Sequence, residues 1–257
     1  MATTILQGFN KLRSNLEITS LQESTVSTRQ TNIRQVIESE MSVLDSFLTG
    51  SYKRSTMIAP LSGADIDIAV VLDPKYYAYD GHASLLDKVK RVLRKTYTKT
   101  QEISRNGQAV TITFTDFKVD VVPSFHRQGG GYLIPDSVSK RWTATDPKKH
   151  VDIWSASNKA HNGDLIPLTK MLKGWNKSHS WLLRSFHLEA LTLQILNNVT
   201  INSFPSGVRY VLDKARSNYK SVFDPAGYGG NLADYIDTTS KAEEIYKRLD
   251  SAYTKAV

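Results

Sequence analysis

Residues 65–72 read DIDIAVVL, and this stretch decides the fold class because it has the clearest strand pattern in the chain. Side chains alternate along a strand, so Asp65 and Asp67 share one face while the isoleucines between and after them point to the core. Two carboxylates held this close repel each other unless a cation lies between them. Oxygen ligands alone select a hard ion, so the pair predicts a site for Mg²⁺, with Mn²⁺ as a second choice. Surface strands often carry such a pair without any metal.

A third carboxylate strengthens the metal hypothesis. Asp120 lies in a second β-rich stretch, residues 117–122, with apolar neighbours on both sides. If this strand pairs with residues 65–72, three carboxylates converge, and such a set can bridge two metal ions for in-line phosphoryl or nucleotidyl displacement. Asp116 is a competing candidate on the same face. We prefer Asp120 because its apolar neighbours place it within the sheet rather than at its end.

Gly50 and Ser51 precede the Asp-x-Asp strand and follow a short apolar run. A glycine there lets backbone N–H groups approach a phosphate, and the serine hydroxyl adds a hydrogen bond. An isolated Gly-Ser is almost always only a turn. Its position ahead of Asp65 makes it a candidate phosphate-binding pair.

The remaining pattern predicts a mixed α+β core followed by a helical lobe, with a boundary near residue 150 and domains at 1–150 and 151–257. One interpretation of the apolar run 43–48 is the end of the long first helix. The expected elements are helices at 25–40, 84–96, 164–177 and 185–197 and after Asp237, strands at 65–72, 109–114 and 117–122, a glycine hairpin or loop at 129–131, and a Pro/Gly-rich loop spanning 205–230.

Composition excludes several classes of protein. The chain has 257 residues, 40% of them hydrophobic and 23% charged, which is ordinary for a folded domain. It has no cysteine, so disulfide frameworks, thiol nucleophiles and cysteine-ligated metal sites are excluded. We expect no membrane span and no secretory signal, and therefore a cytoplasmic protein. The net charge of +8 suits a polyanionic partner, but an ordinary solvated basic surface explains it equally well.

Taken together, Gly50-Ser51, Asp65-Ile66-Asp67 and Val119-Asp120-Val121 resemble the nucleotidyltransferase signature of the DNA polymerase β superfamily. The resemblance extends to the bacterial CD-NTases, relatives of cyclic GMP–AMP synthase and oligoadenylate synthase that act in CBASS anti-phage signalling. It covers most of the chain, about residues 10–250, and it rests on the segments LTGSYKRSTMIAPLSGADIDIAVVL (48–72), WTATDPKKH (142–150), PLTKMLKGWN (167–176) and SFHLEAL (185–191).

The resemblance implies a polymerase-β-like mixed sheet with a long N-terminal spine helix and a C-terminal helical lobe. It also implies that the three aspartates bind catalytic metal ions, and that Gly50 and Ser51 contact the donor triphosphate. Lys173 matches a lysine that contacts the terminal phosphates in relatives, with Lys170 as the fallback, and Ser185 matches a polar position beside it. Ser185 is nearly as well explained as the N-cap of its helix.

The leading functional hypothesis is an enzyme that condenses ribonucleoside triphosphates into a cyclic di- or trinucleotide with release of pyrophosphate. The alternative is a template-independent RNA nucleotidyltransferase of the CCA-adding or poly(A) type. A third hypothesis, a silent nucleic-acid-binding protein, is disfavoured by the intact aspartates. We expect a monomer, with activity that is either constitutive or governed by a regulatory protein. Since the chain lacks a Cys/His insertion, zinc-dependent DNA sensing is not expected.

Overall fold

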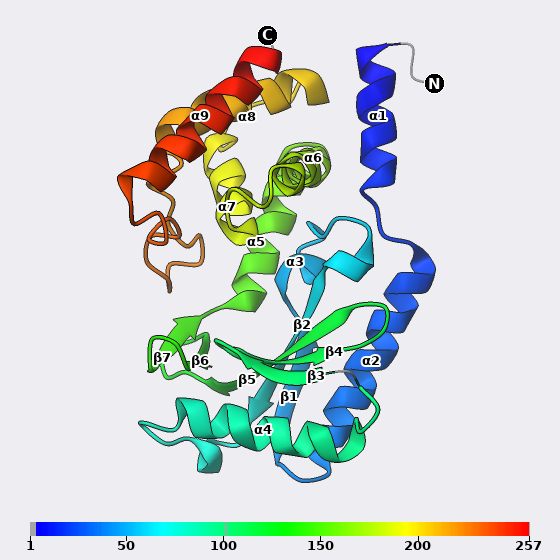
Figure 1. Cartoon of the computed structure of the whole chain (residues 1–257), viewed down its shortest axis with the longest axis vertical. Coiled ribbons are helices and arrows are strands. Elements are labelled where there is room, and N and C mark those ends of the chain that lie inside the picture. The colour runs from blue at the N-terminus through cyan, green and yellow to red at the C-terminus, as the bar shows by residue number, and fades with distance from the viewer. Residues whose placement is uncertain (1–3, 101, 257) are drawn as a thin grey trace. The chain divides into compact units, whose positions relative to one another are not determined.

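The structure is a computed structural model that describes residues 4–100 and 102–256 (Figure 1). The chain divides into two compact units. One unit is Ile18–Lys149, and the other is His150–Val257 together with the N-terminal residues up to Glu17. Within the described ranges, every helix is too short or too polar to cross a membrane.

The unit Ile18–Lys149 is built on a seven-stranded mixed sheet in the order β1-β2-β5-β4-β3, with β6 paired to β5 and β7 paired to β6. Strands β2 and β5 run parallel, and the other described pairs are antiparallel. This confirms the predicted α+β class. The strands are β1 (Val43–Leu48), β2 (Asp65–Leu72), β3 (Glu102–Asn106), β4 (Ala109–Thr113), β5 (Lys118–His126), β6 (Tyr132–Asp136) and β7 (Arg141–Thr145).

The two faces of this sheet differ sharply in polarity. Ile66 of β2, Val119 of β5 and Ile112 of β4 form a continuous buried row across three strands. Helices α2 (Ser20–Glu38) and α4 (His82–Thr96) pack beside each other and join this row in one hydrophobic core. The alternation that buries the row turns the residues on either side of it, the aspartates included, to the opposite face.

Two strand boundaries differ from the sequence prediction. The run 43–48 is strand β1, and the helix before it ends at Glu38. A register irregularity between Val43 and Asp45 interrupts the simple alternation that identifies a strand. Strand β5 also continues through Pro123 to His126, because Pro123 falls between the residues paired with β4 and those paired with β6. No described residue of β4 or β6 pairs with Pro123, so the N–H that proline lacks is not required for a hydrogen bond to either of these strands.

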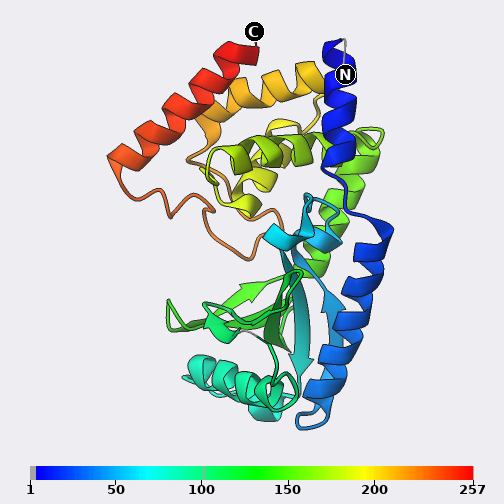
Figure 2. The same cartoon turned by 45° about the vertical axis from the view of Figure 1, so that its right-hand side comes forward.

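The other unit is helical. Its N-terminal helix was not predicted, and it belongs here because it packs on α6 and α8, with Leu16 lying against Gly174. Figure 2 shows α8 and α9 side by side, in agreement with their contacts. The helices are α1 (Ile5–Asn15), α5 (Pro147–Ala160, whose first turn crosses the division), α6 (Leu165–Ser178), α7 (Ser185–Ile195), α8 (Phe204–Asn218) and α9 (Thr239–Ala256).

Helix α8 corrects the predicted Pro/Gly-rich loop. Ser203 caps its N-terminus, and Pro205 lies in the first turn, where the missing N–H costs nothing. Gly207 is kept small by packing, since a Cβ there would lie 2.3 Å from a methyl carbon of Leu168. Only the part of the predicted loop beyond Asn218 is irregular.

Buried polar contacts secure that irregular segment. Asp224 lies within hydrogen-bond distance of His150, 2.5 Å from its ring nitrogen Nε2, and it accepts a 2.7 Å bond from the backbone N–H of Gly229. Burial acts to raise the pKa of Asp224, but these bonds outweigh it and lower that pKa to about 2.

Candidate active site

Strands β2 and β5 bring the three predicted aspartates to one face of the sheet. In the parallel register Asp67 lies directly opposite Asp120, and Asp65 lies opposite Lys118 two positions earlier. Residues two apart on a strand share a face, so all three carboxylates lie on the polar side, opposite the Ile66 row. The same polar row continues onto β4, where Thr111 pairs with Asp120.

Gly50 lies against the carboxylate of Asp67. The backbone N–H of Thr49 donates a 2.9 Å hydrogen bond to the carbonyl of Asp67, which draws the end of β1 onto β2. Gly50 follows with a φ of +64°, and a Cβ at this position would lie 1.7 Å from Asp67 Oδ2. Only glycine fits both the backbone conformation and the space.

Ser51 is the next residue, in the short helix α3 (Gly50–Lys53). Its carbonyl accepts hydrogen bonds from the backbone N–H groups of Thr56 (2.9 Å) and Met57 (3.1 Å), so the chain folds back over this turn. The predicted phosphate-binding pair Gly50-Ser51 and the predicted Asp-x-Asp pair are therefore neighbours within one unit.

The environment of Asp120 disfavours a bare negative charge. Burial raises the pKa of Asp120, and the nearby charge of Asp65 adds to this effect. A 2.5 Å hydrogen bond from Thr111 Oγ1 to Asp120 Oδ1 and the charge of Lys118 act in the opposite direction. A cation placed among these carboxylates would relieve the repulsion.

Asp116, the competing third carboxylate, lies outside this cluster. It precedes β5, and its carboxylate oxygen Oδ2 accepts a 2.7 Å hydrogen bond from Arg29. It also accepts a 2.9 Å bond from the backbone N–H of Phe117. These contacts tie Asp116 to α2, so Asp120 is the third carboxylate of the shared face.

The chemistry of the three aspartates fits a divalent cation, since they offer only hard carboxylate oxygens. In the described residues, no group of three or more His, Cys, Asp or Glu side chains is gathered closely enough to hold a metal ion. The fit therefore rests on the type of donor and on the shared sheet face.

Lys173 and Ser185, the predicted triphosphate contacts of the helical unit, meet at one carboxylate. Lys173 Nζ donates a 2.8 Å hydrogen bond to Glu189 Oε1, and both side chains are buried, 3% and 0% exposed. Ser185 Oγ donates a 3.3 Å bond to the same oxygen. The fallback residue, Lys170, pairs with half-exposed Glu17 at 2.6 Å.

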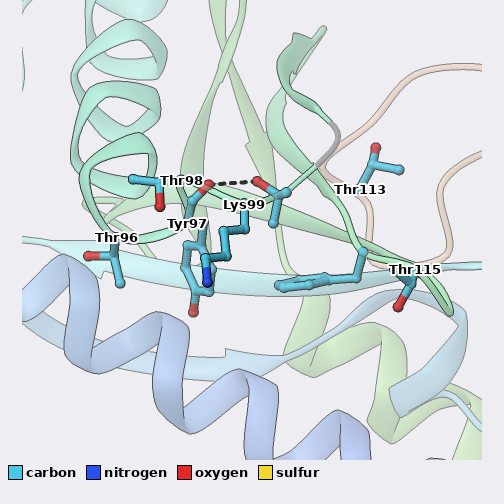
Figure 3. A pocket seen from close by; sticks show the side chains of 8 residues that line it. Thr96, Tyr97, Thr98, Lys99, Thr113 and Thr115 are labelled. Atoms are coloured by element: carbon cyan, nitrogen blue, oxygen red, sulfur yellow. Dashed lines mark hydrogen bonds between the residues drawn. The ribbon is translucent and has the colours of Figure 1, made fainter.

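A separate cavity of about 350 Å³ lies between the C-terminal end of α4 and the turn after β4 (Figure 3). Within it, Thr100 donates a 2.7 Å hydrogen bond to the carbonyl of Tyr97. The rings of Tyr97 and Phe114 meet edge to face. None of the predicted site residues is among the described residues that line it, which are Thr96, Tyr97, Thr98, Lys99, Thr100, Thr113, Phe114 and Thr115.

Two residues of these clusters escaped the sequence analysis. Thr111 lies in AVTIT (109–113), where threonines alternate with apolar residues. This pattern places Thr111 on a polar face but does not identify the partner of its hydroxyl. Glu189 lies in the quoted SFHLEAL segment, between buried Leu188 and buried Ala190. A glutamate in such a setting signals a buried partner, because an isolated buried charge is very costly.

Comparison with known proteins finds a matching family and relatives named as cyclic nucleotide synthases. Residues 3–158 match the family described as Second Messenger Oligonucleotide or Dinucleotide Synthetase domain. A Cyclic AMP-AMP-AMP synthase from Acinetobacter sp. is 28% identical, over 96% of this chain and 77% of its own length. A probable cyclic nucleotide synthase from Bacillus cereus is 25% identical, over 79% of this chain and 73% of its own.

Solved structures share the fold at low identity. The Escherichia coli CdnC:HORMA-deltaN complex matches with a TM-score of 0.77 and 17% identity, over 97% of this chain and 88% of the other. The Elizabethkingia meningoseptica CdnE cyclic dinucleotide synthase, solved with GTP and Apcpp, matches with a TM-score of 0.77 and 16% identity, over 98% and 99%.

Proposed function

The chain belongs to the family of Second Messenger Oligonucleotide or Dinucleotide Synthetase domains, as a CD-NTase of the CBASS type, and from this premise we propose that it condenses ribonucleoside triphosphates into a cyclic di- or trinucleotide. Pyrophosphate is released at each condensation. The Acinetobacter relative, named for the synthesis of a cyclic trinucleotide, supports this proposal because its similarity spans nearly the whole chain.

The observation that carries the proposal is the meeting of Asp67 and Asp120 on adjacent parallel strands, with Asp65 on the same face. In nucleotidyl transfer, a ribose hydroxyl of one nucleotide attacks the α-phosphorus of another. A phosphodiester bond forms, the bond to pyrophosphate breaks, and the hydroxyl proton passes to a base. Ring closure repeats this exchange within the linear intermediate.

We propose that Asp65, Asp67 and Asp120 hold Mg²⁺, with Mn²⁺ able to replace it. A divalent ion at such a site neutralises phosphate charge and lowers the pKa of an attacking hydroxyl. The task of the protein is to hold three carboxylates on one rigid sheet face, so that a triphosphate is bound in a single orientation.

The triphosphate contacts are proposed from the same resemblance. Gly50 and Ser51 lie against the aspartate face, where backbone N–H groups and a hydroxyl suit phosphate oxygens. Lys173 and Ser185 would supply a point charge and a hydroxyl. Since both already donate to Glu189, a phosphate would have to compete with that carboxylate.

Partner, assembly and location also remain proposals. The E. coli relative CdnC, solved in complex with a HORMA protein, supports the idea that a regulatory protein controls this chain. We propose that the protein acts in the cytoplasm, as a monomer with respect to its own copies.

The proposal is tested by incubating the protein with the four ribonucleoside triphosphates and Mg²⁺, without RNA, and treating the products with alkaline phosphatase. A short phosphatase-resistant product is expected, and chelation of the divalent ions should abolish it. Products that form only when an RNA acceptor is added would instead identify a template-independent RNA nucleotidyltransferase.

A further inference from the structure

The hydroxyl of Thr111 holds one oxygen of Asp120. The two residues are direct partners in the antiparallel register of β4 and β5, and Thr111 Oγ1 donates a 2.5 Å hydrogen bond to Asp120 Oδ1. An ionised carboxylate only accepts hydrogen bonds, so the direction of this bond is fixed. It is also short, as expected for a bond to a charged acceptor.

The setting of Thr111 makes this bond rigid. The residue is only 6% exposed, and its neighbours on the strand, Val110 and Ile112, are buried in the core on the other face. A threonine branches at Cβ, which restricts rotation about χ1. The hydroxyl therefore points at Asp120 from a fixed position and leaves Oδ2 for other ligands.

We propose that Thr111 is a positioning residue, which orients the Asp120 carboxylate for the divalent ion without contacting the ion itself. This inference rests on the proposed function, because it takes Asp120 as an ion ligand. Partners that hold the ligands of a metal ion typically change metal affinity or activity by about 10- to 100-fold when they are removed. A threonine that merely satisfied its own hydroxyl would affect folding but not ion binding.

The test compares Mn²⁺ binding by wild-type protein with binding by Thr111→Val, Thr111→Ser and Asp120→Asn, by electron paramagnetic resonance with a non-hydrolysable ATP analogue present. Thr113→Val is the matched control, since it removes a hydroxyl from the same strand and face but pairs with Lys118. Unfolding temperatures are measured for every variant.

Thr111→Val should weaken Mn²⁺ binding by at least about 10-fold, Thr111→Ser should restore it, and Thr113→Val should match wild type. If Thr111→Val does not fold, the Mn²⁺ affinities of Thr111→Ala and Thr111→Ser are compared instead, since these variants also differ in whether the hydroxyl is present. Wild-type affinity in the variant without the hydroxyl, alongside weak binding by Asp120→Asn, would overturn the positioning role alone. Wild-type affinity in Asp120→Asn would overturn the proposed ion site as well.

Discussion

The carboxylate of Asp67 lies where a side chain on Gly50 would have to be, since Oδ2 is 1.7 Å from the position of a Cβ on that glycine. The turn after β1 can therefore approach the Asp-x-Asp strand closely because Gly50 has no side chain. This contact places the predicted phosphate-binding turn beside the predicted ion ligands, and it makes Gly50 a sensitive position for activity.

Gly50→Ala is expected to lower product formation by more than about 100-fold, because the methyl group would displace the carboxylate of Asp67, a proposed ion ligand. Even the loss of a residue that only orients a metal ligand costs about 10- to 100-fold. The left-handed backbone adds a strain of about 1 kcal/mol. Gly107→Ala is the matched control, with a φ of +61° and no described atom within 4 Å of its Cβ. It carries the same strain, so equal loss of activity in both variants would contradict the role of the Asp67 contact.

Replacing Asp65, Asp67 or Asp120 by asparagine should abolish product formation while leaving the unfolding temperature unchanged or slightly raised, because repulsion between carboxylates is relieved. Asp116→Asn is the control. It removes a carboxylate bound to Arg29, away from the shared face, and should retain activity. Turnover assays and thermal unfolding of the four variants check this, and an active Asp67→Asn protein would be incompatible with the site.

Lys173→Met should destabilise the helical unit by about 3–5 kcal/mol, because it removes the cation that forms an ion pair with the buried carboxylate of Glu189. Adding Glu189→Gln should recover part of that loss. Lys170→Met breaks a pair with half-exposed Glu17 and should cost about 1 kcal/mol or less. Denaturant unfolding measures all three, and equal costs for Lys173→Met and Lys170→Met would refute the structural importance of the buried pair.

The helical unit should lose stability as the pH falls from about 6.5 to about 4. Burial lowers the pKa of His187 to about 4, whereas an unfolded histidine titrates near 6.5. Between these values only the unfolded chain binds the proton, so the free energy of unfolding declines by up to roughly 3 kcal/mol. His187→Gln should flatten that decline, and His126→Gln, at an exposed position, should not. If His187→Gln lost stability between pH 6.5 and 4 as steeply as wild type, a group other than His187 would be responsible for the decline.

Much of the fold was predictable where the pattern is regular. The strand 65–72 was predicted with its observed bounds, since alternation at residues 65–68 leads directly into an apolar run at 69–72, and an Asp-Pro pair ends it. Strand β1 was missed because its register is irregular near Asp45. Pro123 suggested the end of a strand, but β5 continues through it because neither β4 nor β6 pairs with β5 at that residue. Such pairing is a property of the whole sheet and is not visible in a local window.

The candidate site likewise has features that a local sequence pattern predicts and features that depend on tertiary structure. Asp65 and Asp67 share a face by local alternation alone, whereas the position of Asp120 opposite Asp67 depends on strand order, which the family resemblance supplied. The burial of Lys173 was not predictable from spacing, because a lysine on a helix is ordinarily solvated. Its partner Glu189 lies on the next helix, so only tertiary structure brings the two charges together.

The most direct test of the central claim is mass spectrometry of the product that wild-type protein makes from ribonucleoside triphosphates and Mg²⁺ without RNA, with Asp67→Asn protein treated in parallel. The account predicts a mass equal to a whole number of nucleoside monophosphates, each less one water, since a ring has no terminal phosphates. The Asp67→Asn sample should contain only unreacted triphosphates. A linear chain that keeps its 5′-triphosphate as the final wild-type product, or the cyclic mass in the Asp67→Asn sample, would contradict the account.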